Sequence, residues 1–185
     1  VWQDNINGDW DIYMYDLTTN QEEAIATGLE NQMIPDIHSD KVVWIGKEGI
    51  YLYDISTKQE RRILETGTSP KIHLNKVVFK TPKPVWDKNS GVSVYDIVTG
   101  EITVVVTDTA YDPYPSIFEN KVVWQDARDG FTNVYLYELD TTVQELVNQT
   151  ETVTTQPITT TEQTTVTSSG LISSINPTYQ EQTTV

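Results

Sequence analysis

Residues 41–44 read Lys-Val-Val-Trp, and this short motif returns further along the chain. Lys-Val-Val-Phe stands at 76–79, Lys-Val-Val-Trp stands at 121–124, and Val1-Trp2 has the form of the end of a fourth copy. The aromatic positions of the four copies are Trp2, Trp44, Phe79 and Trp124. A motif that returns at a period of about 40 residues is typical of repeat architectures, in which each copy forms one structural unit.

Two further landmarks keep the same order around each copy. A Pro-x-Ile motif begins nine residues before the aromatic position in the complete copies, at Pro35, Pro70 and Pro115. A tyrosine followed by an acidic residue comes after it, as Tyr15-Asp16, Tyr53-Asp54, Tyr95-Asp96 and Tyr137-Glu138. Three landmarks in a fixed order predict four units of one structure. We therefore expect the recurring aromatic residues to form the core: Trp2, Trp44, Phe79, Trp124, Tyr15, Tyr53, Tyr95 and Tyr137.

Each unit reads as four short strands. The Pro-x-Ile strand and the Lys-Val-Val-Trp strand are followed by an alternating strand such as residues 50–53 and by a last strand such as residues 60–64. Asn7-Gly8 and Asp129-Gly130 are hairpin-turn dipeptides. Four strands in about 40–45 residues is the period of a β-propeller blade. The predicted fold is all-β: a β-propeller of four-stranded antiparallel blades, with four recognisable repeats in residues 1–147 and an extended Thr-rich segment at 148–185.

Residues 1–17 carry a recognisable pattern, Val-Trp-Gln-Asp-x-x-Asn-Gly-x-x-Asp-Ile-Tyr-x-Tyr-Asp-Leu. This pattern resembles the TolB-like propeller repeats of archaeal cell-surface proteins, and the resemblance covers about residues 1–147. It implies a propeller fold and an extracellular or cell-surface setting. Such propellers serve as scaffolds, as binding platforms and occasionally as domains of enzymes, so the resemblance alone leaves the function open.

The composition excludes several classes of function. The chain has 12 Lys and Arg against 27 Asp and Glu, a formal charge of −15. Nucleic acids and anionic membrane surfaces attract clustered cations, so neither is an expected partner. There is no cysteine, only two histidines, and no apolar run long enough to insert into a membrane. We expect no catalytic residues and no enzymatic activity. The absence of an initiator Met and of a signal-peptide pattern predicts that the chain is a piece of a longer gene product.

The last 45 residues differ from the rest, because they contain 15 Thr and 4 Ser and no basic residue. Pro157 follows Tyr137 by 20 residues, as Pro35 follows Tyr15. Residues 157–159 therefore stand where the next inner strand would begin. The tail closes the ring of its own chain, pairs with the open edge of the next subunit, or leads to further blades. The exposed strand edge of the first unit and the Thr-rich tail favour the second arrangement, in which tail-to-edge pairing joins subunits into a polymer.

Three groups of residues are candidate sites. Asp4, Asn7, Asp9 and Asp11 place oxygen atoms around Gly8 and suggest a Ca²⁺ site. The alternative is a hairpin whose side chains satisfy its own backbone. No other cofactor is expected. His38 and His73 occupy equivalent repeat positions, which explains them better than a metal pair. Asn148 begins the only glycosylation sequon, and the threonines of 152–155 and 159–165 are candidates for O-glycans or form an unmodified spacer.

These observations predict a structural protein of the cell surface or extracellular space. It would be a subunit of a filament or surface layer, assembled by β-strand complementation with other copies of itself or with other surface proteins. One alternative is a propeller module that binds a protein or a glycan, with Trp10 and Trp86 as surface candidates. Another is a non-catalytic propeller domain of a larger surface enzyme.

Overall fold

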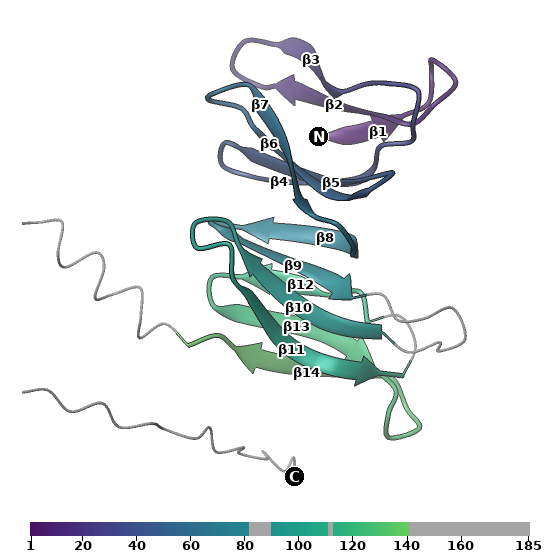
Figure 1. Cartoon of the computed structure of the whole chain (residues 1–185), viewed down its shortest axis with the longest axis vertical. Helices are drawn as coiled ribbons and strands as arrows, with labels where there is room; N and C mark the ends of the chain where they lie inside the picture. Colours follow the sequence, from purple (N-terminus) through teal and green to yellow (C-terminus); the bar gives the residue numbers. More distant parts are fainter. Residues whose placement is uncertain (82–89, 111–112, 141–185) are drawn as a thin grey trace, which may run out of the picture.

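The computed structural model describes residues 1–81, 90–110 and 113–140, and in these residues it contains strands and no helix. The all-β prediction is therefore confirmed for this part of the chain. The strands form four antiparallel sheets, which we call blades 1 to 4 in chain order. The blades are stacked one after another, with blade 1 and blade 4 at opposite ends (Figure 1).

The two middle blades have four strands each and the two end blades have three described strands each. Blade 1 contains β1 (Trp2–Asp4), β2 (Asp11–Asp16) and β3 (Gln21–Ala26). Blade 2 contains β4 (Met33–His38), β5 (Lys41–Gly46), β6 (Gly49–Asp54) and β7 (Gln59–Leu64). Blade 3 contains β8 (Thr68–His73), β9 (Lys76–Thr81), β10 (Ser90–Asp96) and β11 (Ile102–Thr109). Blade 4 contains β12 (Ser116–Phe118), β13 (Lys121–Asp126) and β14 (Asn133–Glu138).

The strand order follows the chain, so each strand pairs with the next one. β1 carries Trp2 and corresponds to β5 and β9, the second strands of the middle blades. Among the described strands blade 1 therefore begins with the equivalent of a second strand, which agrees with the interpretation of Val1-Trp2 as the end of a motif copy. In blade 4 the residues that follow β14 from position 141 lie outside the described residues.

An aromatic pair lies across the second and third strands of three blades. Trp2 pairs with Tyr13, Trp44 with Tyr51 and Trp124 with Tyr135, and the ring centroids are 5.9, 5.9 and 5.8 Å apart. Such stacked cross-strand pairs add to the stability of a sheet beyond the area that they bury. In blade 3 Phe79 faces Ser93, so this stack is absent there.

An aspartate shapes the turn after the third strand of each of the first three blades. Asp16 Oδ1 accepts hydrogen bonds from the backbone N–H of Thr18 and Thr19, and Asp96 Oδ1 accepts from Val98 and Thr99. Asp54 Oδ1 accepts from Thr57 N–H and from the Ser56 hydroxyl. This side-chain bonding is the reason that aspartate favours turns. The residues that close these turns have positive φ: Asn20, Lys58 and Gly100.

Three apolar clusters hold the four blades together, one at each interface between successive blades. The cluster between blades 2 and 3 contains Val43, Ile50, Leu52 and Leu64 from blade 2 and Ile72, Val77, Phe79 and Tyr95 from blade 3. We call the side of a blade that carries its Trp or Phe position the front face, and the opposite side the back face. At every interface the back face of one blade packs against the front face of the next.

Candidate assembly interface

The back face of blade 4 is an exposed apolar surface. It carries Val123, Val134 and Leu136, which correspond by strand pairing to Val43, Ile50 and Leu52 of blade 2. Val134 is 79% exposed where Ile50 is 0% exposed, and Leu136 is 57% exposed where Leu52 is 3% exposed. The residue types are those of a buried interface, but in the described residues neither a following blade nor a fourth strand of blade 4 covers them.

The front face of blade 1 is the complementary exposed surface. Tyr15 is 45% exposed, whereas its counterpart Tyr53 is 8% exposed. Leu17 is 85% exposed, whereas its counterpart Leu139 in blade 4 is 7% exposed. Trp2 lies between these extremes and is half-buried. The prediction that Tyr15 belongs to the core is therefore wrong, because no preceding blade covers this face in the described chain.

The other predicted core residues divide in a similar way. Trp44, Phe79, Trp124, Tyr53 and Tyr95 are all buried at blade interfaces. Tyr137 is 37% exposed, so the core prediction is wrong for this residue too. Its counterparts Tyr53 and Tyr95 pair with residues of a fourth strand, and the corresponding residues of blade 4 lie outside the described ranges.

β1 has an open edge. In blade 2 the equivalent strand β5 pairs on both sides, with β4 through Asp36↔Val43 and Ile37↔Val42 and with β6. In the described residues β1 pairs only with β2. An open strand edge presents backbone N–H and C=O groups that another strand can bind. The open edge of β1 and the exposed front-face residues therefore belong to the same blade.

Hydrogen bonds to the inner strands connect successive blades. Gln3 Oε1 accepts the backbone N–H of Ile34 at 2.6 Å, which links blade 1 to blade 2. Asp36 Oδ2 accepts the N–H of Ile72 at 2.7 Å and links blade 2 to blade 3. An internal interface therefore combines an apolar cluster with a side-chain acceptor that binds the edge of the next inner strand.

The histidines lie in a row of stacked rings at the ends of the inner strands. The ring centroids of His38 and His73 are 4.3 Å apart, and those of His73 and Phe118 are 4.5 Å apart. His73 Nδ1 accepts the backbone N–H of Glu119 at 2.9 Å, which links blade 3 to blade 4. These contacts show a structural role for both histidines.

The residues suggested for Ca²⁺ bond mainly to their own blade. Asp4 Oδ1 accepts the N–H of Ile6, and the buried Asp11 accepts hydrogen bonds from Gly28 N–H, from the Asn7 amide and from the Tyr13 hydroxyl. Among the described residues no three His, Asp or Glu side chains are placed to hold a metal ion, so Asp4, Asp9 and Asp11 do not converge. The geometry favours the hairpin alternative over the Ca²⁺ site.

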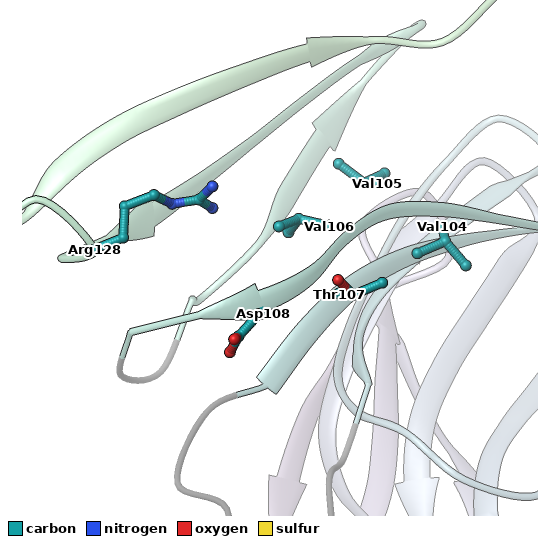
Figure 2. A pocket seen from close by; sticks show the side chains of 6 residues that line it. All are labelled: Val104, Val105, Val106, Thr107, Asp108 and Arg128. Atoms are coloured by element: carbon teal, nitrogen blue, oxygen red, sulfur yellow. The ribbon is translucent and has the colours of Figure 1, made fainter.

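A groove of about 350 Å³ lies between the outer strand of blade 3 and the β13–β14 hairpin of blade 4. It is lined by Val104, Val105, Val106, Thr107, Asp108 and Arg128, and Figure 2 shows Arg128 extending from the hairpin toward β11. The Arg128 guanidinium bonds to Asp126, which also accepts the N–H of Ala110. Burial raises the pKa of Asp126, but Arg128 and the backbone donors outweigh it and the net pKa is lowered. The only cation of the groove lining is thus already paired, and the groove gives no basis for a reaction.

The sequence analysis missed two structural features of the blades. The first is the stacking role of Tyr13, Tyr51 and Tyr135, for which the Tyr-x-Tyr alternation was an available signal. The second is the burial of Asp126 at the junction of blades 3 and 4, which depends on pairing partners far away in the sequence. Other predictions lie outside the described residues: the sequon at Asn148, the whole segment 148–185 and Trp86.

Comparison with solved structures supports the fold. TolB from Acinetobacter baumannii is 20% identical, with a TM-score of 0.56 over 75% of this chain and 37% of that chain. An oligogalacturonate lyase in complex with manganese is 16% identical, with a TM-score of 0.51 over 74% of this chain and 45% of that chain. No family model and no curated protein matches the sequence. The described part of the chain therefore has a TolB-like β-propeller fold, and the chain spans less than half the length of either structure.

No helix long and apolar enough to cross a membrane is found in the described residues. The likeness to a lyase shows the fold alone at this level of identity, and it carries no activity to this chain.

Proposed function

We propose that this protein is a structural, self-assembling subunit of an extracellular filament or surface layer. The observation that supports this proposal is the open surface of blade 1, where β1 pairs only with β2 in the described residues and Tyr15 and Leu17 are exposed. A strand supplied by another copy would pair with β1 and complete the blade, which is the mode of β-strand complementation.

The donor in this proposal is the C-terminal segment around Pro157. Its spacing from Tyr137 repeats the spacing from Tyr15 to Pro35 and from Tyr95 to Pro115, so it stands in the phase of an inner strand. The Thr and Val residues of this segment have high β propensity and need a partner to form a strand. The cell-surface setting follows from the resemblance of residues 1–17 to repeats of archaeal cell-surface proteins.

Sedimentation velocity of the chain with and without residues 150–185 tests this function. We expect large assemblies for the full chain and their loss in the truncated chain. Circular dichroism of the truncated chain serves as the folding control, because the blades described here end before residue 141. Assemblies of the same size in both samples would exclude the tail as the donor strand. A full chain that stays monomeric would exclude the filament altogether.

A further inference from the structure

We infer that the back face of blade 4 in one copy docks on the front face of blade 1 in a second copy. This inference rests on the proposed function and identifies a second contact of the same assembly, independent of the donor strand. The two faces are complementary to each other and belong to the first and the last described blade of one chain. The contact is head-to-tail, because it joins two different surfaces.

The internal interfaces of the chain identify the partner. Three times within one chain, a back face with aliphatic residues packs against a front face with aromatic residues. Between blades 2 and 3, Leu52 belongs to the same cluster as Phe79 and Tyr95. The same positions in the proposed contact are Leu136 of one copy and Trp2 and Tyr15 of the other. The front face of blade 1 in the second copy thus carries the same residue types that cover a back face within the chain.

The exposed faces are also unusual for an isolated domain. On blade 4 Val123, Val134 and Leu136 form an apolar surface that spans two paired strands. On the front face of blade 1 Tyr15 and Leu17 are exposed and Trp2 is half-buried. Blades 1 and 4 lie at opposite ends of the stack (Figure 1). A contiguous exposed apolar patch marks an interaction site, and aromatic residues at its centre are typical of strong contacts. The separation of the two faces allows one copy to bind two neighbours at once.

A charge placed on the back face tests the contact in the full chain. Leu136→Asp introduces a carboxylate that would be buried without a partner, so we expect self-association to weaken by more than about thirtyfold, the loss typical of an interface hot spot. Ile102→Asp is the matched control, because Ile102 is 51% exposed and lies on β11, the last strand of blade 3, which carries neither of the end faces. It should leave self-association unchanged. Both variants should keep the unfolding midpoint of the monomer.

Cross-linking tests the head-to-tail direction, because the chain contains no cysteine. A Leu136→Cys variant and a Leu17→Cys variant are mixed and treated with a short bismaleimide. We expect cross-linked pairs only in the mixture, since each variant alone presents a single kind of labelled face. Efficient cross-linking of Leu136→Cys alone would indicate a symmetric contact and would overturn the inference.

The outcomes separate this contact from strand complementation. Loss of assembly on tail removal but not in Leu136→Asp would leave the proposed function standing and overturn the face contact. Loss of assembly in Leu136→Asp but not on tail removal would support the face contact and overturn the tail as the donor strand. A closed ring of two copies would support the face contact and contradict the filament. A full chain that is monomeric at every concentration would overturn both, and would indicate that the faces are covered by the chain's own tail or by further blades of a longer polypeptide.

Discussion

Blades 2 and 3 carry the same sequence pattern as blades 1 and 4, but only the inner pair is covered on both faces. Ile50 and Val92 are completely buried in the inner blades, while Val134, at the same repeat position in blade 4, is 79% exposed. The exposure of a residue therefore depends on whether a neighbouring blade and the fourth strand of its own blade cover it in the described residues, and not on the residue itself. This comparison shows that the repeat gives each blade two apolar faces that can pack against neighbouring blades. In the described residues each end blade has one such face that no other blade covers.

The largest expected effect separates the equivalent tryptophans of blades 2 and 1. Trp44 is fully buried and its Nε1 donates to Gln32 Oε1 at 2.7 Å, so Trp44→Ala should lower the free energy of unfolding by about 3–5 kcal/mol. Trp2→Ala should cost about 1–2 kcal/mol, because Trp2 is only half-buried. Urea unfolding at low protein concentration measures both. Equal losses would show that blade 1 is as well covered as blade 2 and would contradict the comparison.

A smaller effect separates two hairpin glycines. Gly49 in blade 2 has a φ of +129°, and a Cβ atom there would lie 2.0 Å from the carbonyl oxygen of Leu64. Gly130 in blade 4 has a φ of +86°, and no atom lies within 4 Å of its Cβ position. Gly49→Ala should therefore destabilise the fold by about 3 kcal/mol and Gly130→Ala by about 1 kcal/mol. Thermal unfolding of the two variants gives the order, and a larger loss for Gly130→Ala would be inconsistent with the geometry.

The smallest expected effect concerns the acid sensitivity of the Asp turns. The Ser56 hydroxyl and the Thr57 N–H lower the pKa of Asp54 from 3.8 to about 2. A lowered pKa means that Asp54 contributes stability above about pH 4 and that this contribution is lost as the pH falls through about 2. Asp54→Asn should flatten the decrease in stability between these pH values. Unfolding midpoints of Asp54→Asn and of the unmodified chain, measured from pH 2 to pH 5, test this expectation, and parallel pH profiles would contradict it.

The sequence was sufficient to predict the architecture of the blades. The Lys-Val-Val-Trp motif, the Pro-x-Ile strand and the Tyr-Asp turn recur, and each landmark depends on contacts within one blade or with the next. Such local and repeated contacts produce a recurring sequence pattern, because strand pairing and burial require the same residue types at the same positions of every copy. The strands at 12–15, 50–53 and 60–64 therefore lie where the pattern placed them.

The same reasoning failed where burial depends on the position of a blade in the stack. Tyr15 and Tyr53 are indistinguishable in the pattern, but one is exposed and the other is buried. The four oxygen-bearing residues around Gly8 fit the pattern of a metal site, but the same pattern of alternating acidic residues also occurs in hairpins that bind no metal. Asp11 faces the backbone of Gly28, a partner 17 positions away that no local pattern could have indicated.

The central claim is that the two end faces of the stack pack against each other between copies. Sedimentation velocity of the unmodified chain and of Leu136→Asp over a wide range of concentrations tests it most directly, because strand complementation alone would leave the variant assembled. We predict that species heavier than the 21.0 kDa monomer appear and grow as the concentration of the unmodified chain rises, and that Leu136→Asp suppresses them. A single 21.0 kDa species at all concentrations would contradict the claim.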